Sequence, residues 1–248
     1  MSLSSPSAPL PSTVGAPALE AVDLVRDFGT VRAVNGISFS LRPGEMLAVF
    51  GPNGSGKTSL LRMLSGVLRP SSGTVRIHGA GGGSAAGRGR VGVLSHQTFL
   101  YGSLTPAENL HLYGRLYGLE DLVERVPARL EAVGLSGRGD DRVKTLSRGM
   151  KQRLALARAL LHDPDIVLLD EPWTGLDVHA AGVLRDVLGS LRDGRRTVVL
   201  VTHNLSQGLE LADRVAIQVR GGFAFLERRA MVATPFEAFY REVVEASA

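Results

Sequence analysis

A glycine-rich segment between an apolar run and a helix-like run constrains this chain more than any other feature. The apolar run is Met46–Phe50, and the helix-like run is 59–64. Between them stand Gly51, Pro52, Asn53, Gly54, Ser55, Gly56, Lys57 and Thr58. Glycines let successive backbone N–H groups turn inward around an anion, and the helix that follows adds the positive end of its dipole. The segment therefore predicts a phosphate-binding loop between a strand and a helix of an α/β fold.

The last two residues of this loop carry the groups that would act on a bound phosphate chain. Lys57 can reach the β- and γ-phosphates as a mobile charge, and the Thr58 hydroxyl can ligate a Mg²⁺ ion that bridges them. The alternative is a glycine-rich turn that ends in Lys-Thr by chance. A strand before the loop and a helix after it argue against chance, because that context is what the motif requires.

Composition limits the classes of protein that the chain can represent. Its 248 residues are enough for one large α/β domain, or for one domain with a small inserted lobe. The net charge of +4 is small, and no basic tract with interleaved aromatics occurs, so we expect no nucleic-acid partner. The chain has no cysteine, which excludes disulfides and thiolate metal sites and is compatible with a reducing cytosol.

Neither end of the chain carries the pattern of a membrane or secretory segment. Residues 1–17 are rich in Ser, Pro and Ala and lack the basic-then-apolar order of a secretory signal, so they predict a disordered tail. No apolar stretch approaches the roughly 20 residues that span a bilayer. If the protein works at a membrane, a different subunit must cross it.

Strand and helix patterns alternate along the rest of the chain. The segments 19–25 and 37–41 have the pattern of strands and predict an antiparallel β edge. The glycine-rich stretch 79–89 lacks flanking elements and predicts a flexible surface loop. Thr105 and the Pro-Ala-Glu that follows it form a helix-start signature, and residues from about 98 to 154 are expected to form an α-helical insert in the α/β core.

The second half of the chain places polar residues at the ends of predicted elements. Leu-Ser-Arg-Gly-Met, beginning at Leu146, precedes an amphipathic helix that Ser147 is well placed to cap. A continuous apolar strand then ends in Asp170 and Glu171, at the edge of an α/β sheet where ligands bind. Asp177 precedes a further helix, and His203 follows a strand over 197–201. A terminal helix is expected from about Pro235.

Taken together and in order, these motifs resemble the nucleotide-binding subunit of ATP-binding-cassette (ABC) transporters. The resemblance covers about 19–226. It rests on the phosphate loop, a glutamine after a strand, Leu-Ser-x-Gly before a helix, a strand ending in Asp-Glu, Gly-Leu-Asp, and a strand followed by His. It implies one ABC ATPase domain over 18–235, with a P-loop NTPase core, and a C-terminal helix over 236–248.

The resemblance also implies roles for individual residues around ATP and Mg²⁺. Asp170 is expected in the Mg²⁺ shell beside the loop threonine, and Glu171 is expected to polarise the attacking water as general base. Gln97 is expected to touch Mg²⁺ and that water. His203 would hydrogen-bond the γ-phosphate, and Phe28 would stack on adenine.

Three further residues are expected to act on the nucleotide of a second subunit. Ser147 and Gly149 match the signature that binds the γ-phosphate across a head-to-tail dimer, and Asp177 would lie in the seam between two copies of the chain. The family's usual Leu-Ser-Gly-Gly-Gln has Arg148 and Met150 here, while the serine and second glycine are kept. ATP hydrolysis is therefore expected to require closure of a dimer.

The kind of transporter is predicted from the segment 92–119. With His96, Gln97 and the run from Leu104 to Leu110, it looks most like the ATP-binding subunit of the haem exporter of cytochrome c maturation. ABC-2-type exporter subunits fit nearly as well. The expected location is the cytoplasmic face of the cell membrane, where the surface near 98–119 would dock onto separate permease subunits.

Two other classes of protein compete with a transporter subunit. A soluble ABC ATPase of the Fe–S assembly type has a single cassette and is the serious rival. ABC translation factors carry two cassettes, and the DNA-repair type has long heptad tracts that this chain lacks. A P-loop small-molecule kinase would leave the Leu-Ser-x-Gly tract unexplained.

Overall fold

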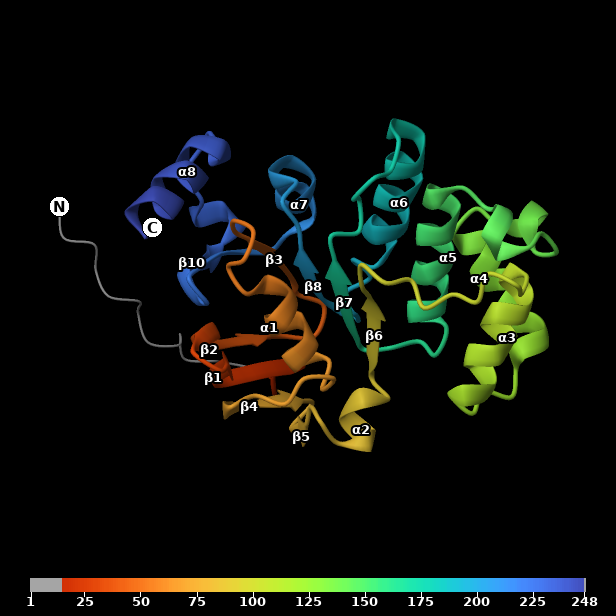
Figure 1. Ribbon diagram of the computed structural model, residues 1–248, viewed down its shortest axis with the longest axis horizontal. Helices are drawn as coiled ribbons and strands as arrows, with labels where there is room; N and C mark the ends of the chain where they lie inside the picture. The colour runs from red at the N-terminus through yellow and green to blue at the C-terminus, as the bar shows by residue number, and fades with distance from the viewer. Residues whose placement is uncertain (1–14, 248) are drawn as a thin grey trace.

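A computed structural model describes residues 15–247, which form two β-sheets with helices between and around them (Figure 1). The predicted disordered tail lies, over residues 1–14, outside the described residues. The larger sheet has the strand order β10-β9-β3-β8-β7-β6, and the smaller has the order β2-β1-β4-β5. The predicted P-loop core with an antiparallel β edge and a helical insert is confirmed.

The larger sheet is parallel except at one edge. Its strands are β3 (Met46–Phe50), β6 (Val91–Leu94), β7 (Ile166–Asp170), β8 (Thr197–Val201), β9 (Arg214–Val219) and β10 (Gly222–Arg228). Only β10 runs antiparallel to its neighbour. In β7, Ile166 and Leu168 point into one hydrophobic cluster while Val167 and Leu169 point into another. Burial on both faces explains why these strands are continuously apolar.

The smaller sheet is antiparallel, as predicted, but its hairpin is longer than the apolar pattern indicates. Its strands are β1 (Leu19–Phe28), β2 (Val31–Leu41), β4 (Ser72–Ile77) and β5 (Ala80–Gly81). Pairing of β1 with β2 continues out to Phe28 and Val31. The residues at that end of the hairpin are largely exposed, so apolar and polar side chains do not have to alternate there.

Helices cover both faces of the larger sheet. Helix α1 (Lys57–Leu64) lies between the two sheets and buries Leu60 and Leu64 there. On the opposite face lie α5 (Arg148–Leu160), α6 (Val178–Ser190), α7 (Leu205–Leu211) and α8 (Phe236–Ala246). The Phe236 ring packs edge-on against Phe50, with ring centroids 5.1 Å apart. The predicted terminal helix therefore packs onto the core near the end of β3.

The helical insert lies at the opposite end of the molecule from α8 (Figure 1). It contains α3 (Pro106–Leu116), α4 (Leu122–Ala132) and the short 3-10 helices η1 (Ser136–Arg138) and η2 (Val143–Thr145). Thr105 begins α3 with a reciprocal capping box, in which its hydroxyl accepts from the Glu108 N–H and Glu108 accepts from the Thr105 N–H. Across the described part of the chain, no helix combines the length and apolar character needed to cross a bilayer.

The prediction of a simple loop over 79–89 was wrong. This stretch contains β5 and a one-turn helix, α2 (Ala85–Arg88). The Ser84 hydroxyl accepts a hydrogen bond from the Gly87 N–H at 3.0 Å and so caps the helix. A serine cap followed by two alanines outweighs the low helix propensity of the surrounding glycines.

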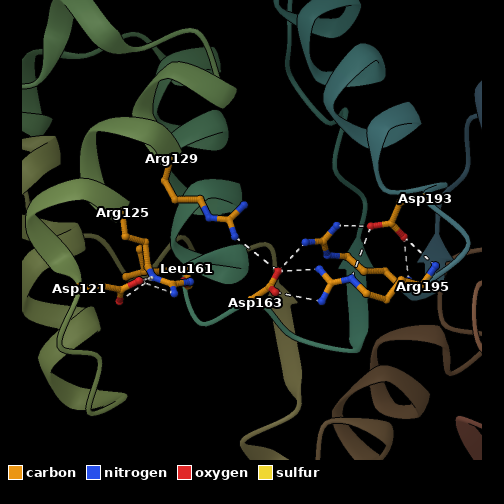
Figure 2. A network of polar contacts seen from close by, with 8 residues as sticks. Asp121, Arg125, Arg129, Leu161, Asp163, Asp193 and Arg195 are labelled. Carbon is orange, nitrogen blue, oxygen red and sulfur yellow. Dashed lines mark hydrogen bonds and ion pairs between the residues drawn. The ribbon is translucent and has the colours of Figure 1, made fainter.

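One carboxylate joins the insert to the core (Figure 2). Asp163, just after α5, receives two hydrogen bonds of 2.8 and 2.9 Å from the Arg195 guanidinium, and Arg196 donates to it at 2.5 Å. Arg129 of α4 lies 3.6 Å away on the insert side. The Arg195 hydrogen bonds, followed by those of Arg196, hold the pKa of the Asp163 carboxyl well below its ordinary value, although partial burial opposes them.

Substitution Asp163→Asn should lower the free energy of unfolding by about 1 kcal/mol at pH 7, because partly exposed ion pairs are screened. Since the folded pKa is lowered, this contribution is present above the unfolded-state pKa of about 3.9 and is lost as pH falls below it. The free energy of unfolding in urea should therefore differ between wild type and variant by a constant amount from pH 7 to 5, and this difference should become smaller below about pH 4. Asp186→Asn, at an exposed aspartate of α6, is the matched control. A difference in unfolding free energy that stays unchanged down to pH 3 would contradict a stabilising role for the ionised Asp163 carboxylate.

Candidate active site

The predicted phosphate loop follows β3 directly and is shaped by close backbone contacts. A Cβ atom on Gly51 would lie 2.2 Å from the Gln218 carbonyl oxygen, and one on Gly56 would lie 1.9 Å from the Ala33 carbonyl oxygen. Gly56 also has φ +101°, a conformation that disfavours any side chain. These two positions therefore require glycine, and the loop leads into the N-terminus of α1, where an anion is favoured.

Lys57 lies across the loop that precedes it. Its Nζ donates to the carbonyls of Gly51 and Pro52, both at 2.8 Å. Burial lowers the pKa of Lys57, while the charges of Glu171 and Asp170 act to raise it. The ammonium group is thus fixed over the loop, where it can reach phosphate oxygens.

The contact of Thr58 with Asp170 brings the loop and the end of β7 together. The Thr58 hydroxyl donates to Asp170 Oδ2 at 3.2 Å. Burial raises the pKa of the Asp170 carboxyl, the Thr58 hydrogen bond lowers it, and the charge of Glu171 raises it. Adjacent hydroxyl and carboxylate oxygens suit Mg²⁺, a hard cation that prefers oxygen ligands.

Protein groups alone do not complete a metal shell at this point. Within residues 15–247, no group of three or more His, Asp or Glu side chains is placed to hold a metal ion. Mg²⁺ is commonly bound by one or two carboxylates together with substrate phosphates and water. The Thr58 and Asp170 pair fits that mode of binding, in which the metal arrives with its phosphate ligand.

Glu171 and His203 are in direct contact. His203 Nδ1 lies 2.7 Å from Glu171 Oε2, and the His203 backbone N–H donates to the same oxygen at 3.2 Å. Glu171 has φ +50°, which is uncommon for a residue with a side chain. Its backbone N–H donates to the Val201 carbonyl of β8. The first residue after β7 is therefore turned out of the strand path, and its carboxylate points toward the segment that follows β8.

Gln97 makes no hydrogen bond to Thr58 or Asp170. Its side chain is exposed and makes no hydrogen bond to another described residue, although its carbonyl accepts from the Ser95 hydroxyl. The neighbouring His96 lies close enough to Asp170 for its charge to lower the pKa of that carboxyl. The metal-contacting role of Gln97 stays a prediction.

Phe28 does not pack into the core. Its side chain is 46% exposed at the end of the β1–β2 hairpin. The Arg26 guanidinium lies over the ring, 4.6 Å from its centroid. The ring is free to stack on a planar group, and the adenine-stacking role stays a prediction.

Ser147 and Asp177 both cap helices in their own protomer. The Ser147 hydroxyl accepts from the Met150 N–H at 3.2 Å, and Asp177 Oδ1 accepts from the Ala180 N–H at 2.8 Å. Gly149 lies where α5 meets α6, so close that a Cβ on it would be 2.7 Å from the Ala180 Cβ. The structural roles of these residues are clear, and their roles across a dimer stay predictions.

Two contacts that link the signature to the segment after β7 were missed from the sequence. Gln152 Nε2 donates to the Pro172 carbonyl at 3.1 Å. The Arg148 guanidinium covers Gly175, with its central carbon 2.2 Å from the position that a Cβ on Gly175 would occupy. The sequence showed only that Arg148 departs from the usual signature. An unusual residue does not by itself indicate which residue it contacts.

Known proteins resemble this chain in sequence over most of its length. The family model described as ABC transporter matches residues 34–174. The chain is 40% identical over 208 residues to the Nod factor export ATP-binding protein I of Paraburkholderia xenovorans, covering 82% of this chain and 68% of that protein. It is 34% identical to the linearmycin resistance ATP-binding protein LnrL of Bacillus subtilis, and the match covers 82% of this chain and 67% of that protein. It is 37% identical to the ABC transporter ATP-binding protein NatA of the same species, and that match covers 77% of this chain and 80% of NatA.

Solved structures agree with these sequence relatives. An ATP-binding subunit of an ABC transporter superposes with a TM-score of 0.82 at 25% identity, covering 91% of this chain and 99% of that chain. A dimeric ATP-binding cassette with ADP and phosphate superposes at 0.77 and 24% identity, covering 85% and 98%, which shows the shared fold. With the phosphate loop, the Thr58–Asp170 contact and Glu171 in place, this chain belongs to the ABC transporter family, as an ATP-binding and ATP-hydrolysing subunit.

Proposed function

We propose that this chain powers an ABC-2-type exporter from the cytoplasmic face of the membrane, coupling ATP-driven dimer closure to transport by separate permease subunits. The contact between Thr58 and Asp170 carries the ATPase part of the proposal, because it joins the phosphate loop to the strand that directly precedes Glu171, the proposed general base. The site thus has a place for the triphosphate, a place for its metal and a carboxylate beside both.

Hydrolysis at this site needs one proton acceptor and fixed positive charge. Glu171 accepts a proton from water as the water oxygen attacks the γ-phosphorus, and the bond to the β–γ bridging oxygen breaks to release ADP and phosphate. His203, 2.7 Å from Glu171, orients that carboxylate and would hydrogen-bond the γ-phosphate. Lys57 stabilises the charge on the β- and γ-oxygens.

Mg²⁺ would be held by Thr58 and Asp170, with Gln97 as a further contact. When bound, the metal would neutralise the negative charge that develops on the phosphate oxygens. Phe28, at the exposed tip of the β1–β2 hairpin, would stack on the adenine ring.

A second copy of the chain would complete each site. The N-terminus of α5 is an anion site that the protomer's own phosphate loop does not use, and the exposed Ser147 caps it. In a head-to-tail dimer, Ser147 and Gly149 of each copy would contact the γ-phosphate held by the other, with Asp177 in the seam. Hydrolysis would then depend on closure.

The exported substrate is of the class handled by ABC-2-type systems. One relative is named for Nod factor export and another for linearmycin resistance, and these names support an export role. None of the relatives compared above is named for haem, so haem export stays a prediction without added support. A soluble Fe–S assembly role is less favoured, because these relatives are named for export and transport.

The docking surface would be the exposed apolar side of the segment 98–119. Leu116 is 72% exposed there, and the Phe99 and Tyr101 side chains are more than half exposed. Apolar side chains that a single protomer leaves in water suit contact with another protein. This surface lies on the helical insert, which also carries the signature at the start of α5, so contact with a permease can bear on dimer closure.

Glu171→Gln should lower ATP turnover by at least about 10²-fold, because the amide cannot accept the proton from water. ATP binding should be retained, since Glu171 makes no hydrogen bond to the phosphate loop, and the hydrogen bonds of its backbone N–H and its carboxylate join it to Val201 and His203. Phosphate release measures turnover, and titration with a fluorescent ATP analogue measures binding. Glu210→Gln, the same change at an exposed glutamate of α7, should behave as wild type. Turnover at the wild-type rate in the Glu171 variant would refute the base.

Ser147→Ala in the Glu171→Gln background should reduce the ATP-dependent dimer measured by light scattering, with little change in ATP affinity of the monomer. Loss of the cap alone costs about 1 kcal/mol of stability. Ser84→Ala removes a comparable serine cap from α2 and controls for that cost. Equal loss of dimerisation in both variants would argue against a role in trans.

Leu116→Glu should abolish co-purification of a polytopic membrane protein from detergent-solubilised membranes, while leaving ATP binding intact. A charge placed in an apolar contact is costly to desolvate. Val123→Glu, at a side chain of α4 that is 83% exposed, is the control outside the docking segment. Retention of the partner by the Leu116 variant, or its loss from both, would contradict the proposed surface.

A further inference from the structure

One buried polar side chain near the phosphate loop has no part in the site described above. Gln218 lies on β9 with 0% of its surface exposed, between the apolar residues Ile217 and Val219. Its Nε2 donates only a long hydrogen bond, 3.5 Å, to the Gly221 carbonyl. Among the described residues, neither its Oε1 nor the buried Ser55 hydroxyl has a hydrogen-bond partner. Burying an amide with so few partners costs stability, so packing alone does not account for a glutamine here.

Gln218 touches the phosphate loop at both ends. Its backbone carbonyl oxygen is 2.2 Å from the position that a Cβ on Gly51 would take, and its Nε2 is 2.9 Å from the corresponding position on Gly56. The residue therefore lies along the side of the loop that faces β9. The two glycines that this loop requires are the two that Gln218 approaches.

The turn between β9 and β10 extends this support to the loop backbone. Arg220 and Gly221 both have positive φ, +48° and +83°, as in a tight two-residue hairpin turn. The Gly221 N–H donates to the Ser55 carbonyl at 3.0 Å. The Gly221 carbonyl accepts from Gln218 Nε2 and from the Asn35 N–H, at 3.5 and 2.9 Å. Gln218 thus holds the turn, and the turn holds Ser55.

The direction of one N–H group follows from this contact. Ser55 C=O and Gly56 N–H belong to the same planar peptide and point in opposite directions. Holding the Ser55 carbonyl on the turn therefore aims the Gly56 N–H away from the turn, into the concave side of the loop where phosphate binds.

We propose that Gln218 is a positioning residue for ATP binding, which holds the Ser55–Gly56 peptide in its phosphate-binding orientation at a cost in stability. The contact acts within one protomer, so it is independent of the dimer and of any membrane partner.

The test is Gln218→Met, which keeps the length of the side chain and removes both polar atoms. ATP affinity of the isolated subunit should fall about tenfold, the effect of losing one positioning hydrogen bond to a charged ligand. The thermal midpoint without nucleotide should stay equal or rise, because a poorly partnered amide has been replaced by an apolar group. The KM for ATP should rise more than kcat falls.

Thr197→Val provides the matched control. Thr197 is also fully buried, but it lies at the opposite end of the sheet, where its hydroxyl donates to the Arg42 carbonyl at 3.0 Å. This variant should lower the thermal midpoint and leave ATP affinity unchanged. Two results would overturn the proposal for Gln218→Met: unchanged ATP affinity, or weaker affinity together with a lowered midpoint, which is what a purely structural role predicts.

Discussion

The order of three parallel strands is the constraint on which the rest of this protein depends. Because β3, β8 and β7 are neighbours that run in the same direction, the residues that follow each of them meet at one edge of the sheet. The phosphate loop follows β3, His203 follows β8, Asp170 ends β7 and Glu171 comes directly after it. The Thr58–Asp170 and Glu171–His203 contacts are the direct result. Each strand is buried on both faces, so a shift in register would draw the polar residues that flank the strand into the core.

Much of this arrangement was predictable from the sequence, because the reactive groups follow apolar runs whose direction is set by the fold class. The loop at 51–58, the strand ending in Asp170 and the helix capped by Ser147 all depend on local patterns. Contacts between distant segments were not predictable in this way. The pairing of His203 with Glu171 and the packing of Arg148 on Gly175 need the turn that gives Glu171 its positive φ and the approach of α5 to α6.

Two kinds of local pattern misled the sequence interpretation. Glycines in 79–89 indicated a loop, but a single serine cap was enough to form a helical turn. The β1–β2 hairpin extends beyond its apolar alternation because its tip is not buried. No sequence pattern indicated the contact of Gln218 with the phosphate loop. A single polar residue in an apolar strand can be interpreted only when the backbone of the neighbouring loop is known.

The contacts of α5 with the segment after β7 have a mechanical consequence. Gln152 donates a hydrogen bond to the Pro172 carbonyl and Arg148 covers Gly175, so the start of α5 contacts the segment that follows Glu171 at two points. Pro172 is the next residue after Glu171. A small rotation of α5 would therefore pull on the backbone of Glu171 within the same polypeptide. A partner that binds the start of α5 would therefore act on the position of the Glu171 carboxylate in the same copy of the chain.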